Sequence, residues 1–407
     1  MQNNKLTTRL SSLLLSGSLF AAACTFTACS KEEVAPSSPS IASSETSTDA
    51  RVANGIPGKY IVVLKDASVA TAESDDYNEK VRKVKNKADN VLRGKGIRPD
   101  KIERTYGNVL KGFAAQLTAQ EAAALALDPE VAYVEADQVM SISQTSTTTT
   151  TTQPAQTIPY GINRVGAADA TGRTAWVIDT GIELNHPDLT VDAARSRSFV
   201  PNVSSPTDGN GHGTHVAGTI GAKYNSIGVV GVAANATLVA VRVLDANGSG
   251  TSSGVIAGVD YVGAYARVGE VANMSLGGGI SQALDDAVVR AANKGILFAV
   301  AAGNDAISAT QHSPARVNHA NVFTVSAMDN TDTFASFSCF GNPPVDFCMP
   351  GVNINSTYIG GRYATMSGTS MATPHMAGVL LVRGKHFNLS GTVKGDRDST
   401  PDRIAHI

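Results

Sequence analysis

The sequence predicts an α/β protein: a doubly wound domain with a parallel sheet, preceded by a small ferredoxin-like α+β domain. Two observations lead to this prediction. From about residue 157 onward, short runs that are apolar throughout alternate with helical stretches, as expected for parallel strands buried on both faces. Before them, residues 58–143 are predicted to form a strand, a helix, a strand, a helix and a strand, which is the order of a split βαβ unit. The chain of 407 residues is long enough for two such units.

The larger domain is expected over residues 157–407. Its predicted strands are apolar throughout and lie at 175–178, 240–244, 271–274 and 297–301. Between them, stretches such as 253–268 and 280–294 are predicted as helices. In a doubly wound sheet the ligand site lies at the carboxyl ends of the strands, so functional residues are expected directly after these runs.

The smaller domain is expected over residues 58–143, with strands near 60–64, 109–117 and 131–135. Its first helix is predicted from apolar residues that share one face at helical spacing: Tyr77, Val81, Val84, Ala88, Val91 and Leu92. Its second helix is predicted to begin at Thr118, because Glu121 three residues later completes a capping box.

Charge and composition argue against some classes of partner but do not indicate an activity. Lys and Arg number 33 against 35 for Asp and Glu, so nucleic acid and anionic surfaces are not expected as partners. Aromatic residues make up only 5%, whereas there are 38 glycines. Small residues in that number suit tightly packed α/β structure with many sharp turns.

The first 29 residues predict export. Lys5 and Arg9 precede an apolar run, 10–23, that ends in small residues. This is the layout of a secretory signal, and the run is too short to span a membrane. A flexible tether follows at 30–57, because a stretch rich in Ser, Pro and Thr cannot build a core.

Cysteines at the end of the signal indicate a lipid anchor. Cys24 and Cys29 each follow an alanine, and a small residue before cysteine resembles a bacterial lipoprotein signal, in which the cysteine is acylated. Cys29 is preferred because residues 30–33 resemble the surface-export tag of some Gram-negative lipoproteins. Acylation at Cys24 is one alternative, and ordinary cleavage with free secretion is the other. An exported bacterial protein is expected, either an outer-membrane or cell-surface lipoprotein or a secreted protein.

Two further cysteines and a threonine-rich stretch carry predictions of their own. In an exported protein a close pair such as Cys339 and Cys348 predicts a disulfide, which would contribute about 2–3 kcal/mol. Two free buried thiols are the alternative. Residues 144–156 are predicted as an exposed linker with a processing site, because polar linkers are where proteolytic nicking concentrates.

Three segments each place a polar residue at the end of an apolar element. Asp179 leaves a predicted strand, His212 opens a helix of small residues, and Ser370 stands where a helix begins. Each has an ordinary explanation alone, such as a helix cap. Together they supply what peptide hydrolysis needs: a nucleophile, a base that is neutral near pH 7, and a carboxylate that holds the base in one tautomer.

The segments WVIDTG (176–181), GHGTHVAG (211–218) and GTSMATPH (368–375), in this order, resemble the signature blocks of subtilisin-like serine proteases, nearest to the proteinase K branch. The resemblance runs from about residue 156 to 382. It implies a serine endopeptidase that uses Asp179, His212 and Ser370 through an acyl-enzyme, acts on proteins and peptides, needs no cofactor for catalysis and is a monomer.

The same resemblance assigns further roles. Asn304 matches the oxyanion-hole asparagine, donating together with the Ser370 backbone N–H. Two strand edges are expected to bind the substrate backbone: Gly248, Ser249 and Gly250, and Ser275, Leu276, Gly277 and Gly278. Ala301, Ala302 and Gly303 are expected to line a roomy, uncharged first pocket, so neutral or apolar side chains are expected before the cut.

The smaller domain resembles the inhibitory propeptide that precedes such proteases, from GKYIV (58–62) to VEAD (134–137). This implies that the protein cuts its own chain, that the propeptide stays bound as an inhibitor, and that the membrane anchor acts before processing. A structural calcium ion is also implied, held by Asp346 and the carbonyl groups of Ala320 and Val322.

The sequence leaves two alternative functions to compare. A catalytically inactive surface binding protein on the same fold is the alternative, but Asp179, His212, Ser370 and Asn304 are all present, and inactive relatives usually lose at least one. A lipase or esterase would require Gly-x-Ser-x-Gly around the nucleophile and the order Ser, Asp, His, and neither occurs around Ser370.

Overall fold

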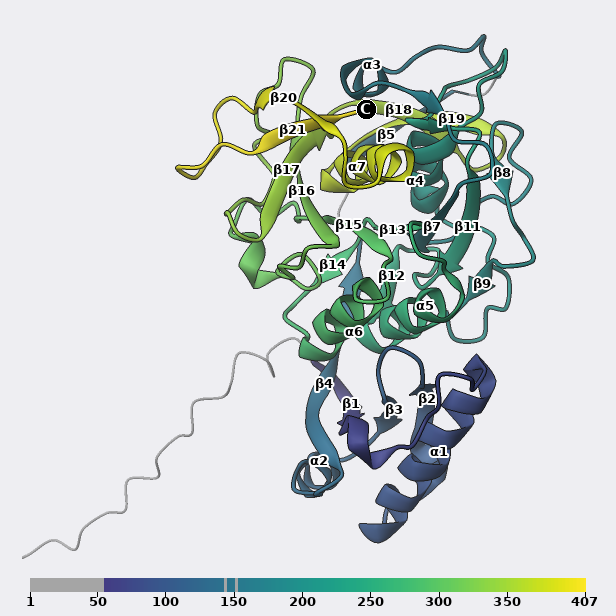
Figure 1. The fold of residues 1–407 in the computed structure, drawn as a ribbon, viewed down its shortest axis with the longest axis vertical. Coiled ribbons are helices and arrows are strands. Elements are labelled where there is room, and N and C mark those ends of the chain that lie inside the picture. Colours follow the sequence, from purple (N-terminus) through teal and green to yellow (C-terminus); the bar gives the residue numbers. More distant parts are fainter. Residues whose placement is uncertain (1–54, 143–144, 151–152) are drawn as a thin grey trace, which may run out of the picture. The chain divides into compact units, whose positions relative to one another are not determined.

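The computed structural model describes residues 55–142, 145–150 and 153–407 (Figure 1). The predicted signal peptide, nearly all of the tether, and both Cys24 and Cys29 lie outside the described residues. Across the described residues, every helix is too short or too polar to cross a membrane.

The small domain is an antiparallel sheet with the two predicted helices, and its strand at 102–106 was not predicted. Its strands are β1 (Gly55–Leu64), β2 (Ile102–Tyr106), β3 (Gly112–Gln116) and β4 (Val131–Ser141), and they lie in the order β4-β1-β3-β2. Helices α1 (Tyr77–Gly94) and α2 (Ala119–Ala126) pack on one face of this sheet. The predicted capping box at Thr118 is confirmed, since both of its hydrogen bonds with Glu121 are present.

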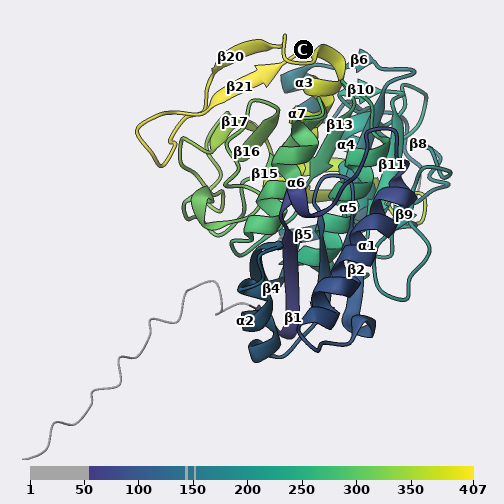
Figure 2. The same ribbon diagram turned by 60° about the horizontal axis from the view of Figure 1, so that its bottom comes forward.

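The second half of strand β1, residues 61–64, is apolar because both faces of its sheet are covered there. Val62 and Leu64 point to the domain's own helices. Ile61 and Val63 belong instead to a core that they share with α5 (Ser252–Tyr265) and α6 (Gln282–Ala292) of the larger domain. Figures 1 and 2 both show these two helices next to the small domain's sheet.

The larger domain contains the predicted parallel sheet. Its central strands are β16 (Val322–Met328), β15 (Leu297–Ala301), β13 (Val271–Met274), β7 (Thr174–Asp179) and β11 (Thr237–Arg242), neighbours in that order and all parallel. Helices α4 (His212–Gly221) and α7 (Thr369–Arg383) pack on one face and α5 and α6 on the other. The doubly wound fold class is therefore confirmed.

A hairpin forms one edge of the sheet. After α7 the chain forms β20 (Asn388–Thr392) and β21 (Arg403–His406), and β21 lies parallel to its neighbour β17 (Val345–Pro350). Asp402, only 2% exposed, ties the hairpin to the sheet, because its carboxylate accepts a hydrogen bond from Ser326 of β16. Burial raises the pKa of Asp402 to about 7.

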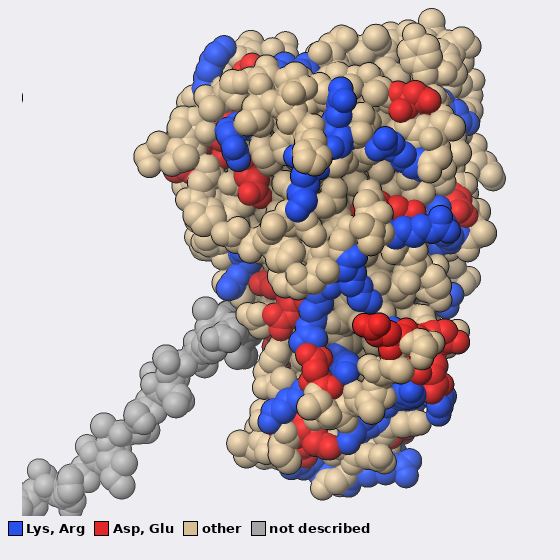
Figure 3. Space-filling model, in the orientation of Figure 1, with Lys and Arg blue, Asp and Glu red and all other residues tan. Residues whose placement is uncertain are grey.

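Charged side chains are unevenly distributed. On the face in Figure 3, basic and acidic groups intermingle and are densest over the small domain. Several are paired along α1, for example Arg82 with Glu79 at 2.6 Å and Lys85 with Asp89 at 3.0 Å. Exposed pairs of this kind each contribute little to stability.

Candidate active site

Three elements bring the predicted catalytic residues to one end of the sheet. Asp179 is the last residue of β7, His212 is the first of α4, and Ser370 is the second of α7. Both helices pack on the same face of the sheet. The side chains are buried, with exposed fractions of 0%, 0% and 2%. Gly211 before α4 has φ 113°, and a Cβ there would lie 2.3 Å from the Tyr358 ring, so only glycine fits.

Asp179 fixes the tautomer of His212. His212 Nδ1 lies 2.8 Å from Asp179 Oδ1, which also accepts the backbone N–H of Thr180 at 2.7 Å. Because an ionised carboxylate only accepts hydrogen bonds, Nδ1 must carry the proton and Nε2 must be the acceptor. Nε2 is buried and has no hydrogen-bond partner among the described residues.

The hydroxyl of Ser370 is held by a neighbouring carbonyl. Its Oγ donates to the Ser275 carbonyl oxygen at 3.1 Å, and Ser275 Oγ donates in return to the Ser370 carbonyl oxygen at 2.8 Å. The hydroxyl proton is therefore directed at Ser275 rather than at His212. Distances between nucleophile and base often shorten only when substrate binds.

Asn304 lies close to Ser370. It follows the end of β15, and its Oδ1 accepts the backbone N–H of Thr369 at 2.8 Å. This bond fixes the amide, so that the Nδ2 donor is on the side away from Thr369. Asn304 and Ser370 line the same cavity.

That cavity has a volume of about 460 Å³ and contains the predicted first pocket. The residues that line it include most of those predicted to contact substrate: Leu276, Gly277, Gly278, Ala301, Ala302 and Gly303. Ser141 and Ile142 of the small domain also line it, as do Asp305 and His312. Asp305 and His312 are not among the site residues predicted from the sequence.

The two predicted substrate edges hold a segment of this chain between them. Met140 at the end of β4 lies opposite both Gly250 of β12 (Ser249–Thr251) and Gly278 of β14 (Gly277–Gly278), and all pairing is antiparallel. Ser141 likewise lies opposite both edges. A Cβ at Gly278 would come within 2.6 Å of Met140 Sδ, so glycine there permits the close approach.

After residue 144 the chain pairs with a strand that ends three residues before Ser370. Residues Thr145–Thr150 form strand β5, which pairs antiparallel with β19 (Arg362–Ser367). Thr145 lies opposite Ser367, three residues before Ser370. The sequence predicted only a linker here, because its threonine-rich composition carries no strand pattern of its own.

Two carboxylates of β4 cap helices of the larger domain. Asp137 accepts the backbone N–H of Ser253 at 2.9 Å and its hydroxyl at 2.6 Å, at the start of α5. Glu135 accepts the hydroxyl of Ser281 at 2.6 Å and the N–H of Gln282 at 2.9 Å, at the start of α6. Negative charge at a helix N-terminus is stabilising. Burial nevertheless raises the pKa of both carboxyl groups above their ordinary values.

A third carboxylate belongs to the larger domain and accepts hydrogen bonds from the small one. Asp260 of α5 is fully buried and accepts the backbone N–H groups of Gly107, Asn108 and Val109, at 3.1, 2.8 and 2.7 Å. These residues join β2 to β3 in the small domain. Burial raises the pKa of Asp260. The larger domain therefore caps a turn of the small one, and the small one caps two of its helices.

The residues assigned to calcium do not fit that ion together. The ammonium of Lys385 donates to the Ala320 carbonyl oxygen at 3.3 Å, and a fixed positive charge there repels a divalent cation. Asp346 Oδ2 accepts the backbone N–H of Thr324 at 2.9 Å, and burial raises the pKa of Asp346 to about 6. Val322 begins the paired strand β16. These groups are accounted for without an ion.

The predicted disulfide is wrong. Cys339 and Cys348 are both free and buried. Their side chains pack in different hydrophobic clusters, Cys339 with Ala302 and Ala309, and Cys348 with Met328 and others. Two cysteines that point into separate clusters cannot meet the geometry of a disulfide without backbone movement.

Comparison with known proteins identifies both domains. Residues 172–391 match the model of the Subtilase family, and residues 59–143 match Peptidase inhibitor I9. The extracellular serine proteinase of Thermus sp. strain Rt41A is 41% identical over 332 residues, covering 79% of each chain. Alkaline serine exoprotease A of Vibrio alginolyticus is 40% identical over 333 residues, which is 80% of this chain but 60% of that protein.

A solved structure, of a cold adapted subtilisin-like serine proteinase, matches with a TM-score of 0.54 and 42% identity. It covers 61% of this chain, and this chain covers 97% of it. These matches agree with the parallel-sheet fold and with the resemblance drawn from the three sequence blocks. The chain therefore belongs to the subtilase family, as a serine endopeptidase whose catalytic domain follows a peptidase inhibitor domain of type I9.

Proposed function

We propose that the protein is an exported endopeptidase in which Ser370 is the nucleophile, His212 the general base and Asp179 the carboxylate that orients it. The observation that carries this proposal is the buried 2.8 Å hydrogen bond between His212 Nδ1 and Asp179 Oδ1. It leaves Nε2 as a proton acceptor at the end of the sheet where Ser370 lies. Export is supported by the signal-like N-terminus, and one relative is itself named extracellular.

The reaction follows from these positions. Rotation about its Cα–Cβ bond takes Ser370 Oγ from the Ser275 carbonyl to His212 Nε2, which accepts the proton as Oγ attacks the substrate carbonyl carbon. Asp179 stabilises the imidazolium. Asn304 Nδ2 and the Ser370 backbone N–H donate to the new oxyanion. His212 then protonates the leaving amine, and water hydrolyses the acyl-enzyme with His212 again as base.

Substrate is proposed to bind as an added strand between β12 and β14, as Met140 and Ser141 do. The pocket at Ala301, Ala302 and Gly303 carries no charge, which favours neutral or apolar side chains before the cut. This specificity is broad, because no single polar group in that wall selects one side chain.

Self-processing is proposed to occur between Ile142 and Thr145. Ile142 lines the cavity together with Ser370. Thr145 pairs with Ser367, three residues before the nucleophile. The bond to be cut is thereby bounded on both sides. After the cut, β4 stays between the substrate edges and blocks them, so the small domain is a product-like inhibitor.

Asp137→Ala should weaken this inhibition. Loss of a helix-capping side chain costs about 0.5–2 kcal/mol, so the small domain supplied separately should bind the mature protease about 2- to 30-fold more weakly. The inhibition constant measured with a peptide substrate checks this. Asp100→Ala is the matched control, because Asp100 is exposed and its ion pair with Arg98 is within the small domain. Equal inhibition by all three proteins would contradict a binding role for the cap.

A lipid anchor at Cys29 is proposed from the signal sequence alone. The cut at 142–145 lies on the far side of the inhibitor domain from Cys29, so processing should release the protease from the membrane. Growth with a labelled fatty acid should label the precursor and the Cys24→Ala variant, but not Cys29→Ala. Label lost only in Cys24→Ala would move the site, and no label in any protein would indicate free secretion.

A further inference from the structure

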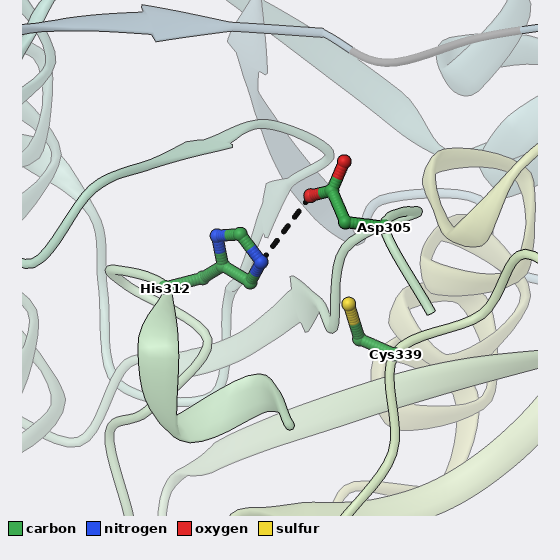
Figure 4. Close-up of side chains that lie close together, drawn as sticks. All are labelled: Asp305, His312 and Cys339. Carbon is green, nitrogen blue, oxygen red and sulfur yellow. Dashed lines mark ion pairs between the residues drawn. The ribbon is translucent and has the colours of Figure 1, made fainter. Parts of the chain in front are cut away.

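Three side chains converge beside the substrate cavity without a role in the proposed reaction. They are Asp305, directly after Asn304; His312, after the turn Ala309–Gln311; and Cys339, in the loop between β16 and β17. One ligand atom from each lies within 4.8 Å of the other two, and this is the one such group of His, Cys, Asp or Glu in the described chain. Figure 4 shows the Asp305 carboxylate facing the His312 ring, with the Cys339 sulfur pointing toward the same space.

We propose that Asp305, His312 and Cys339 bind a divalent transition-metal ion of the zinc type, and that the bound ion slows peptide hydrolysis. The ion-binding part stands on the geometry of the cluster. The inhibitory part rests on the proposed function of Ser370 and Asn304.

The spacing suits a small tetrahedral ion. Donor atoms around tetrahedral zinc are about 3.3–3.8 Å apart, given bond lengths of about 2.0–2.3 Å. His312 Nε2 and Asp305 Oδ2 are already 3.2 Å apart. Contraction by about 1 Å brings all three into range, and the Asp305 side chain, 58% exposed, is able to move. Asp305 and His312 line the cavity, which provides an entry path and room for water as the fourth ligand.

The histidine is held in the tautomer that a metal requires. His312 Nδ1 lies 3.3 Å from the carbonyl oxygen of Gly278, and since a carbonyl only accepts, Nδ1 is the donor. In the neutral imidazole this leaves the lone pair of Nε2 directed at the cluster. Nε2 is buried and makes no hydrogen bond of normal geometry with a described residue. A backbone carbonyl on the other nitrogen is the usual outer support of a zinc-bound histidine.

The thiol favours zinc over calcium or magnesium. Sulfur and imidazole nitrogen are the ligands that zinc prefers, whereas calcium and magnesium require oxygen.

The cluster contacts the proposed catalytic machinery at three places. Asp305 is bonded directly to Asn304, His312 holds the carbonyl of Gly278 in a substrate edge, and a Cβ on Gly303 would lie 3.0 Å from Cys339 Sγ. An ion that draws Asp305 inward shifts the 303–305 loop. Because small misplacements near reacting atoms cost much of the rate, we expect kcat/KM to fall about tenfold when the ion is bound.

Cobalt(II) tests binding without using activity. The full chain, with thiols reduced, is titrated with Co²⁺, and we expect the near-ultraviolet charge-transfer absorption that a thiolate–cobalt bond gives. Cys339→Ala should abolish this band, whereas the matched control Cys348→Ala should keep it, and zinc should remove it by displacement. The metal site is refuted if the wild type shows no band, or if Cys339→Ala shows the same band as the wild type. The three residues would then be only an ion pair between Asp305 and His312 beside the buried Cys339 thiol.

A second variant covers the case in which Cys339→Ala fails to fold. Asp305→Asn changes an exposed side chain and keeps the thiol. The band should therefore remain while cobalt affinity falls about tenfold or more, since even outer-shell partners are worth about 10- to 100-fold. Unchanged affinity would remove Asp305 from the ligand set and contradict the three-residue site.

Zinc inhibition tests the functional part. The rate of each protein with saturating zinc is compared with its own zinc-free rate, and we expect about a tenfold loss in the wild type and in Cys348→Ala, but not in Cys339→Ala. Equal inhibition of Cys339→Ala would place the inhibitory ion elsewhere and overturn the inhibitory role. Loss of the proposed function would instead appear as no peptidase activity in any protein while the cobalt band persists.

Discussion

Ser370→Ala should abolish peptide hydrolysis and leave the precursor uncut. Without Oγ there is no nucleophile to form the acyl-enzyme, and His212 has no proton to accept. Triads of this kind lose about a millionfold in kcat when the serine is removed. The same substitution should keep residues 142 and 145 joined, because the proposed cut uses the same hydroxyl. Residual turnover then reflects only binding and oxyanion stabilisation.

Gel electrophoresis and N-terminal sequencing distinguish the outcomes. Wild type should give two fragments that co-purify early, whereas Ser370→Ala should remain one chain. Serine-directed fluorophosphonates should label wild type at Ser370 alone. Ser356→Ala is the matched control, because Ser356 is also buried and its hydroxyl donates to the His215 carbonyl oxygen, so that variant should be cut and labelled normally. A Ser370→Ala precursor cut at the same bond in a protease-free extract would refute self-processing.

The fold could be predicted because local pattern and tertiary environment agree. Trp176, Val177 and Ile178 are apolar in succession, and the structure explains this: Val177 faces α4 and α7, while Trp176 and Ile178 face α5 and α6. A strand covered on both sides has no polar face to interrupt the pattern. Asp179 could be singled out for the same reason, since it is the charged residue at which such a strand ends.

What the sequence could not indicate depends on contacts between distant residues. Glu135 and Asp137 cap helices through contacts with residues 146 and 116 positions away, and no local signal marks them as caps for another domain. Ile61 and Val63 look like ordinary strand residues, although they form part of the joint between the two domains. Strand β5 forms by pairing with β19. A run of threonines does not indicate which strand it will pair with.

The incorrect disulfide has a related physical cause. Short spacing between Cys339 and Cys348 satisfies the sequence criterion, but the direction of each side chain is set by the element that carries it. Cys348 is in β17 and packs with the C-terminal hairpin residue Ile404, whereas Cys339 packs beneath the cavity near Ala302. Short sequence spacing between two cysteines therefore overestimates the chance of a disulfide when a strand begins between them.

Asn304→Ala should lower kcat by about a hundred- to a thousandfold and change KM little, because an oxyanion-hole donor interacts most strongly in the transition state. Self-processing should slow by a similar factor, so precursor should accumulate before the mature protease appears. Steady-state kinetics with a peptide substrate check the first expectation, and the time course of fragment formation checks the second.

Alanine also removes the acceptor for the Thr369 N–H, which lies 2.8 Å from Asn304 Oδ1, and this complicates a single substitution. Asn304→Asp separates the two effects, because a carboxylate keeps an acceptor for Thr369 but replaces the Nδ2 donor with a negatively charged oxygen. If Asn304 stabilises the oxyanion, aspartate should be at least as damaging to kcat as alanine. Recovery of kcat in Asn304→Asp would mean that Asn304 only positions the start of α7. A rise in KM with kcat intact would assign Asn304 to ground-state substrate binding.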